Sequence, residues 1–267
     1  MSEIFTRYLK SEFVSFKHAK GISERIGNEF HLFHEILLFL GGEAELVSET
    51  VHTKLSPQTL IVIPKETYHQ IIIKGDQKEY CRCVFQFYNI EKSKSLIERA
   101  MKDLFITEID KNIIYLFSKM MTLAKSENKS SEAPLVESVL YLLLDEIINK
   151  RDLNTAEMVL GDRLTKLTIE YISEKLTENL DINTIAGELN VSPSTLMHTF
   201  RKNMNIPIHK YIIKKRLIAA HTKISNGEQA VVAASECGFN DYSGFYKQYV
   251  NMFDHTPSMS NVKRLKE

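Results

Sequence analysis

The stretch DINTIAGELNVSPSTLMHTFRK, residues 181–202, predicts two helices joined by a tight turn. The turn falls at Asn190 and Val191, after which Ser192 is a good N-cap and Pro193 suits the first helical position. In a helix-turn-helix unit, the exposed face of the second helix enters the major groove of DNA. The buried sides repeat at helical spacing: Ile182, Ile185, Ala186 and Leu189 in the first helix, Leu196 and Phe200 in the second.

A second copy of the pattern follows a long helix predicted over residues 208–224. Residues 228–236 form a short helix rich in Ala and Val, and residues 237–239, Cys-Gly-Phe, make the turn. Asn240 or Asp241 can cap the next helix. Two copies in one order indicate a DNA-binding fold far more strongly than one copy, because alanine-rich helix pairs are common. The buried residues of the last helix are Phe245 and Tyr249.

Both copies belong to a longer set of residues: Ile185-Ala186, Leu189, Val191-Ser192-Pro193, Leu196, Phe200-Arg201-Lys202, Pro207, Tyr211-Ile212, Arg216-Leu217, Ala219 or Ala220, Glu236, Gly238-Phe239, Asp241, Ser243, Phe245 and Thr256-Pro257. This set resembles the DNA-binding region of the arabinose-regulator (AraC/XylS) family of bacterial transcription factors. The resemblance covers roughly residues 165–260. It implies a cupin-like effector or dimerisation domain over residues 1–150, a linker over 151–163 and a double helix-turn-helix domain over 164–267.

The fold class expected from the resemblance and the sequence pattern is α+β. An antiparallel cupin-like β-barrel with following helices precedes an all-α domain, in which a long helix joins the two helix-turn-helix units. The pattern itself supports the first part, because short apolar segments separated by Gly, Pro and Asp are typical of an antiparallel sandwich or barrel. These predicted strands are residues 35–40, 43–48, 59–63, 70–73 and 80–87.

Three helices are predicted after the strands, because the apolar period changes from 2 to 3.6. They cover residues 96–104, 113–124 and 135–149. The third helix has Leu135, Val139, Leu142, Leu143 and Ile147 on its main stripe and Leu140 and Tyr141 off it. A helix with two apolar faces often packs on a second subunit, and the alternative is that it lies between two elements of its own chain. We expect a homodimer.

The family's mode of binding implies which side chains meet DNA. The base-reading positions carried over are Ser194, Thr195, Met197 and His198 in the first unit, and Tyr242, Ser243, Tyr246 and Lys247 in the second. Contacts with phosphate are implied for Ser192, Arg201, Lys202 and Lys247, while Lys214, Lys215 and Arg216 add positive field or internal ion pairs. Leu196, Phe200, Phe239 and Phe245 are expected in the core.

Several positions depart from the family pattern. Asn205 stands where Gly is usual, Gly244 interrupts the second recognition helix, and Tyr249-Val250-Asn251 replaces a Phe-Lys-Lys tail. Gly inside a helix costs about 1 kcal/mol relative to Ala. We therefore expect the second unit to be less stable and to bind phosphate less well than the first.

The cupin-like resemblance raises the question of a metal site in the first domain. Enzymatic cupins hold a divalent metal with a His-x-His pair, a Glu and a distant His. His31, Glu35 and His69 fit three of these positions, but Glu29 takes the place of the first His, and His34 is expected on the opposite face of its strand from Glu35. The preferred interpretation is that His31, Glu35 and His69 line an effector pocket or hydrogen-bond within the barrel, with no metal bound.

Composition and charge agree with a DNA-binding regulator. The 267 residues are 43% hydrophobic and 25% charged, which excludes disordered and fibrous classes, and no apolar run approaches the about 18 residues that span a bilayer. The net charge is zero, yet residues 190–267 carry 11 basic and 5 acidic side chains, a surplus of six positive charges. A basic end on a neutral chain suggests a polyanion partner, and the alternative is ordinary scatter in charge. Three cysteines and the lack of a signal pattern indicate the cytoplasm.

The leading hypothesis is a sequence-specific transcription regulator, controlled by a small molecule in the N-terminal barrel. Its expected partners are double-stranded DNA, the effector, a second copy of the chain and RNA polymerase, with no membrane. A sugar is the effector suggested by analogy with the family. The sequence offers no catalytic set, so we expect no enzymatic activity and no cofactor. The alternatives are a metal-dependent cupin enzyme with a helical accessory domain, and a regulator whose first domain only dimerises or binds protein.

Overall fold

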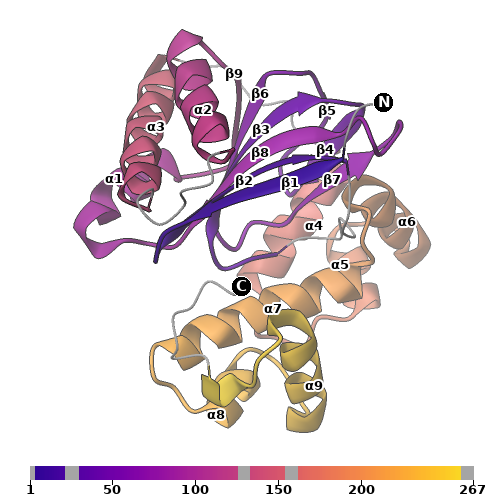
Figure 1. Ribbon diagram of the computed structural model, residues 1–267. Helices are drawn as coiled ribbons and strands as arrows, with labels where there is room; N and C mark the ends of the chain where they lie inside the picture. The colour runs from indigo at the N-terminus through magenta and orange to yellow at the C-terminus, as the bar shows by residue number, and fades with distance from the viewer. Residues whose placement is uncertain (1–3, 22–29, 126–132, 154–161, 260–267) are drawn as a thin grey trace. The chain divides into compact units, whose positions relative to one another are not determined.

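The computed structural model describes residues 4–21, 30–125, 133–153 and 162–259. The chain divides into two compact units, residues 1–160 and residues 161–267 (Figure 1). Within its described residues, the first unit contains the two sheets, three α-helices and a short 3₁₀ helix, Glu91–Ser93, and the described part of the second unit contains helices without strands. The α+β class expected from the sequence is therefore confirmed.

The strands of the first unit form two antiparallel sheets. The larger sheet has the order β1-β2-β8-β3-β6-β9 and the smaller one the order β5-β4-β7, so the described strands do not close into the expected barrel. Strand β3 pairs with β6 on one side and β8 on the other, so neither of its edges is open to β4. Strand β4 pairs with β5 and β7 instead. The strands are β1 (Phe5–Lys10), β2 (Val14–Lys20), β3 (His34–Gly41), β4 (Ala44–Ser48), β5 (His52–Leu55), β6 (Thr59–Ile63), β7 (His69–Ile73), β8 (Cys81–Phe87) and β9 (Phe105–Glu108).

Strand β3 is buried on both faces, which explains its unbroken apolar sequence. Ile36 and Leu38 belong to the core shared with the helices, whereas Leu37 and Phe39 belong to a second core shared with the smaller sheet. Successive side chains of a strand point to opposite faces. Glu35 therefore lies on the face of Leu37, between the two sheets.

Three helices cover the other face of the larger sheet: α1 (Lys94–Ala100), α2 (Lys111–Leu123) and α3 (Ala133–Leu153). Helices α2 and α3 lie side by side (Figure 1). The buried stripe of α3 consists of Val136, Val139, Leu140, Leu143, Leu144, Ile147 and Ile148. The prediction for this stripe was wrong at three positions, since Leu135 and Leu142 are exposed and Leu140 is fully buried.

Helix α3 continues beyond its predicted end at Asn149. Arg151 explains the extension, because its Nε donates to the carbonyl oxygen of Ala100 at 3.0 Å and its Nη1 pairs with the Asp103 carboxylate. These bonds fix the last turn of α3 against the end of α1. Residues 151–153 of the predicted linker are thus helical, Asp162 caps the next helix, and residues 154–161 lie outside the described part.

The second unit contains six α-helices and a final short 3₁₀ turn, Pro257–Met259, in its described residues. Helix α4 packs against α6, and the long helix α7 packs against α8 and α9. The core of the second half joins residues of α7, α8 and α9 around Phe245 and Tyr249. The helices are α4 (Arg163–Glu174), α5 (Ile182–Glu188), α6 (Pro193–Met204), α7 (Ile208–Ser225), α8 (Ala230–Glu236) and α9 (Tyr242–Phe253).

Candidate functional site

The first helix-turn-helix unit is α5 and α6, joined by a turn with one left-handed residue. Asn190 has a φ of 55° and donates to the carbonyl oxygen of Gly187 at 3.1 Å. The N–H of Val191 donates back to Ala186 at 3.0 Å. This pair of bonds is the Schellman arrangement, which satisfies the last carbonyls of a helix and turns the chain sharply.

The second helix-turn-helix, formed by α8 and α9, uses the same turn. Gly238 has a φ of 82° and donates to the carbonyl oxygen of Ser235 at 3.0 Å, and Phe239 donates to Ala234 at 3.0 Å. Asp241 caps α9 through the N–H groups of Ser243 and Gly244, as Ser192 caps α6 through that of Thr195. The two copies expected from the sequence thus share their backbone geometry as well as their residue pattern.

Each second helix presents the predicted base-reading residues to solvent. The exposed side chains are Ser194, Thr195, Met197 and His198 on α6, and Tyr242, Ser243, Tyr246 and Lys247 on α9. On the opposite side, Leu196, Phe200 and Phe245 are buried, and Phe239 is partly buried against the same core as Phe245. The division between exposed and core positions follows the prediction, and contact with DNA remains a prediction for each exposed residue.

Two hydroxyl groups at the start of α6 are already engaged. The Ser192 Oγ accepts from the N–H of Thr195 at 3.1 Å and lies 2.8 Å from the Thr195 Oγ1. Ser192 therefore stabilises the start of α6, and its predicted contact with phosphate remains a prediction. The Thr195 hydroxyl can bond to a base only while it also bonds to Ser192. Otherwise the Thr195 methyl group would have to make the contact.

The predicted phosphate contacts Arg201, Lys202 and Lys247 are exposed at the surface. No carboxylate within the described ranges forms an ion pair with any of these three side chains. Lys223 differs from them, since it pairs with Glu228 at 3.4 Å and with Glu236. The three unpaired cations are therefore available to neutralise a polyanion.

Arg216 has a structural role that the sequence did not reveal. From the middle of α7, its Nε donates to the carbonyl oxygen of Leu176 at 2.8 Å and its Nη1 to that of Gly238 at 2.8 Å. Its Nη2 donates to the backbone carbonyl oxygen of Glu178 at 2.6 Å. One guanidinium thus joins the segment after α4 to the turn between α8 and α9. It is bound internally rather than presented to DNA.

A buried histidine joins α7 to α9. The Nδ1 atom of His221 lies 2.5 Å from the Tyr249 hydroxyl oxygen, and its ring packs against Phe253 at 4.6 Å between centroids. Burial, with a smaller contribution from nearby His255, lowers the pKa of His221 to about 4. The neutral imidazole is therefore the form that the folded unit accommodates.

This shift predicts that acid destabilises the second unit. Between pH 6.5 and about 4 the unfolded chain binds the His221 proton and the folded unit does not, so stability falls as the pH drops through this window. We expect His221 to account for a loss on the order of 2 kcal/mol between pH 7 and pH 4. Urea unfolding of residues 162–267 across this range measures it. The variant His221→Gln should show a flatter pH dependence, and an unchanged slope would contradict the assignment.

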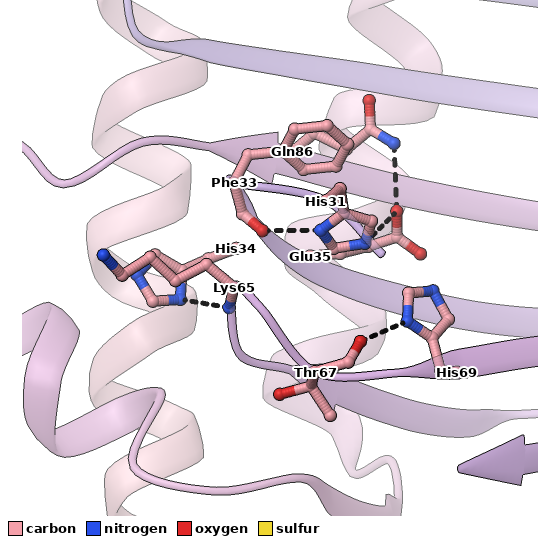
Figure 2. Close-up of polar contacts among 8 residues, drawn as sticks. All are labelled: His31, Phe33, His34, Glu35, Lys65, Thr67, His69 and Gln86. Carbon is pink, nitrogen blue, oxygen red and sulfur yellow. Dashed lines mark hydrogen bonds and ion pairs between the residues drawn. The ribbon is translucent and has the colours of Figure 1, made fainter. Parts of the chain in front are cut away.

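The predicted effector residues His31, Glu35 and His69 come together between the two sheets of the first unit (Figure 2). His31 precedes β3, Glu35 is its second residue, and His69 begins β7 in the other sheet. One donor atom from each residue lies within 4.8 Å of the others, and all three residues are buried. Glu29, the fourth position considered, lies outside the described residues.

His34 points away from this cluster, as the strand alternation predicts. Its Nε2 lies 2.8 Å from the Asn89 Oδ1, and its Nδ1 accepts from the N–H of Lys65 at 3.2 Å. Burial lowers the pKa of His34 to about 4. His34 therefore supports the fold beside the cluster without belonging to it.

Comparison with known proteins finds a domain match in the second unit and similarity to named regulators. Residues 185–260 match the family model of a helix-turn-helix domain. The Msm operon regulatory protein of Streptococcus mutans is 30% identical over 151 residues, which cover 54% of this chain and 54% of that protein. The probable transcriptional regulator LumQ of Photobacterium leiognathi is 22% identical over 85% of this chain and 89% of its own length. The alignment with the first of these relatives thus spans about half of its length.

Among solved structures, ToxT from Vibrio cholerae with an unsaturated fatty acid bound is 16% identical and has a TM-score of 0.41, with 97% of this chain and 96% of that chain covered.

No helix of the described ranges is both long and apolar enough to cross a membrane.

The second unit, residues 161–267, contains two helix-turn-helix motifs of the same geometry, each with an exposed second helix. It is therefore a double helix-turn-helix domain. The family model that matches residues 185–260 agrees with the helix-turn-helix domain expected from the sequence. The chain carries a helix-turn-helix domain of the AraC/XylS type at its C-terminal end.

Proposed function

We propose that the protein is a sequence-specific DNA-binding regulator of transcription. The supporting observation is the pair of helix-turn-helix units, with the same turn and with exposed second helices α6 and α9. In this proposal the exposed faces of both helices read bases, and Arg201, Lys202 and Lys247 contact phosphates. The named relatives are regulators, which supports regulation rather than catalysis as the function.

Selection from a genomic DNA library with the purified full chain tests this proposal. We expect enrichment of fragments that share a common sequence element, with and without candidate sugars in the buffer. As a matched control, Lys166→Ala removes one positive charge that is already paired with Glu170 at 3.8 Å, and it should enrich the same element. Recovery of fragments with no shared element from a folded protein would contradict sequence-specific binding.

The first unit supplies the regulatory part of the proposal. A small-molecule effector would bind between its sheets near His31, Glu35 and His69, where the structure buries polar groups among apolar residues. Such a ligand controls DNA binding only through different affinities for two states of the protein. The activating or repressing sign of this control is a separate property that DNA binding alone does not set.

Dimerisation through α3 is the second regulatory feature that we propose. Leu135 and Leu142 lie two turns apart on the helix and are exposed, Leu142 by 57%. Burial of such leucines against a second copy is favourable by about 1.5–3 kcal/mol per side chain. We expect the full chain to sediment as a dimer at micromolar concentration and Leu142→Glu to shift it toward monomer. The control Glu137→Gln, on the same helix, should leave the dimer intact, and a monomeric wild type would contradict this role.

A further inference from the structure

We propose that His31, Glu35 and His69 bind a divalent first-row transition-metal ion between the two sheets of the first unit. The three residues are exposed by only 9%, 4% and 1%, and one donor atom of each lies within 4.8 Å of the others. The inference concerns a property of the first unit that does not depend on DNA binding. It departs from the sequence-based expectation of no metal, which rested on Glu29 in place of a histidine.

The hydrogen bonds of the two histidines orient them as metal ligands. The Nδ1 of His31 lies 2.7 Å from the carbonyl oxygen of Phe33, and the Nδ1 of His69 lies 3.2 Å from that of Thr67 (Figure 2). A carbonyl oxygen can only accept, so each Nδ1 carries a proton, and in the neutral form of each ring the lone pair is on Nε2. Metal-binding histidines characteristically donate their second ring N–H to a carbonyl or carboxylate in this way.

The positions of the two rings are also fixed by packing. The His31 ring stacks on Phe33 with centroids 4.0 Å apart and planes 8° from parallel. The rings of His31 and His69 meet edge to face, with centroids 4.9 Å apart. The two imidazoles therefore approach each other from the segment before β3 and from the start of β7, and their hydrogen bonds and stacking oppose rotation out of the cluster.

Glu35 supplies the third, anionic donor. Its Oε2 lies 3.8 Å from the His31 Nε2 and accepts a bond of 2.9 Å from the Gln86 Nε2. Gln86 is paired with Glu35 across the β3–β8 ladder, so the amide that orients the carboxylate comes from the neighbouring strand. A divalent cation would balance the charge of this buried carboxylate.

The donor set identifies the class of ion. Two imidazole nitrogens and one carboxylate oxygen suit Zn²⁺, Fe²⁺, Co²⁺ or Ni²⁺, whereas Mg²⁺ and Ca²⁺ prefer oxygen ligands throughout. Metal–ligand bonds of about 2.1 Å place neighbouring donors roughly 3.0–3.4 Å apart, so small side-chain rotations suffice to close the cluster around an ion. Three protein ligands leave further positions for water or for oxygen atoms of a bound effector.

Titration of the full chain with Co²⁺, after removal of metal by chelation, tests the site. We expect one Co²⁺ per chain, visible absorption bands from the coordinated ion, and displacement of Co²⁺ by Zn²⁺. Glu35→Gln and His69→Gln should each weaken binding by more than about 10- to 100-fold, the range known for loss of an outer-shell partner. Gln86→Ala should fall within that range, because it removes only the residue that orients Glu35.

The control variant is His52→Gln, which breaks a histidine–carboxylate pair on the surface, His52 with Glu45 at 3.4 Å. It should leave Co²⁺ affinity unchanged. If Glu35→Gln or His69→Gln does not fold, the wild type still decides the question, because Zn²⁺ must raise its thermal midpoint and bind with a stoichiometry of one. Absence of binding to the wild type, equal affinity in the Glu35→Gln variant, or loss of the bands in His52→Gln would overturn the proposal. Since no DNA is present, failure here leaves the proposed function standing.

Discussion

Arg216→Ala is expected to lower the free energy of unfolding of residues 162–267 by about 3 kcal/mol. A hydrogen bond to a charged group contributes about 1.5–3 kcal/mol, and three such bonds end on this guanidinium, although water partly replaces them in the variant. The bonds join Leu176 and Glu178 to Gly238, so their loss loosens the connection between the two halves of the unit. Gly238 is matched to this contact, since a Cβ there would lie 2.8 Å from the Arg216 Cζ.

Urea unfolding followed by circular dichroism measures this effect. Arg216→Lys should be intermediate, because an ammonium is a point charge and cannot direct donors to three carbonyls as the planar guanidinium does. The control is Lys210→Ala, an exposed position on the same helix, which should change stability by less than about 0.5 kcal/mol. A loss in Arg216→Ala no larger than that of the control would show that the guanidinium does not hold the unit together.

His198→Ala is expected to relax sequence preference more than Tyr246→Ala does. Loss of a base contact typically costs about 1–3 kcal/mol at one base-pair position, which corresponds to about 5- to 150-fold in discrimination. His198 lies exposed on α6, whose cap by Ser192 and opening Pro193 define its start well. Gly244 lies in the first turn of α9, where its N–H bonds to the Asp241 cap, and not in the helix interior as predicted. Helix α9 lacks a basic pair at Val250 and Asn251, so we expect it to contribute less.

Binding of both variants to a set of single-base-substituted sites distinguishes the two helices. His209→Ala, another exposed histidine, serves as the matched control and should leave discrimination unchanged. The competing possibility is that Tyr242 and Tyr246, both exposed, make apolar base contacts that compensate for the missing lysines. A larger loss of discrimination in Tyr246→Ala than in His198→Ala would make α9 the principal reader and reverse the expected order.

Local signals explain what could be predicted from the sequence. The start of α6 was predictable because Ser192 and Pro193 act through bonds and dihedrals of their immediate neighbours. The same holds for Glu35 and His34, which a strand places on opposite faces whatever its partners are. The two turns at Asn190 and Gly238 were also expected, since a left-handed position favours Gly or Asn.

Non-local pairings account for the differences. The apolar run of β3 shows that the strand is buried on both faces, but its pattern does not say which strands pair with it, so two sheets were not distinguished from a barrel. The stripe of α3 was misassigned because two apolar faces compete, and packing against α1, α2 and the sheet selects one of them. Similarly, three consecutive basic residues on α7 do not indicate that Arg216 is the one bound to carbonyl oxygens far along the chain.

The binding of residues 162–267 to duplex DNA across a salt series tests the DNA-binding assignment most directly. With a site from the genomic selection, affinity should fall steeply with salt, since Arg201, Lys202 and Lys247 displace counterions from phosphates. Arg201→Ala should weaken specific and random DNA by similar factors and reduce the slope of log affinity against log salt by about one unit, whereas the paired Lys166→Ala should leave it unchanged. A folded fragment without salt-sensitive binding, or with the same slope in Arg201→Ala as in the wild type, would contradict the account.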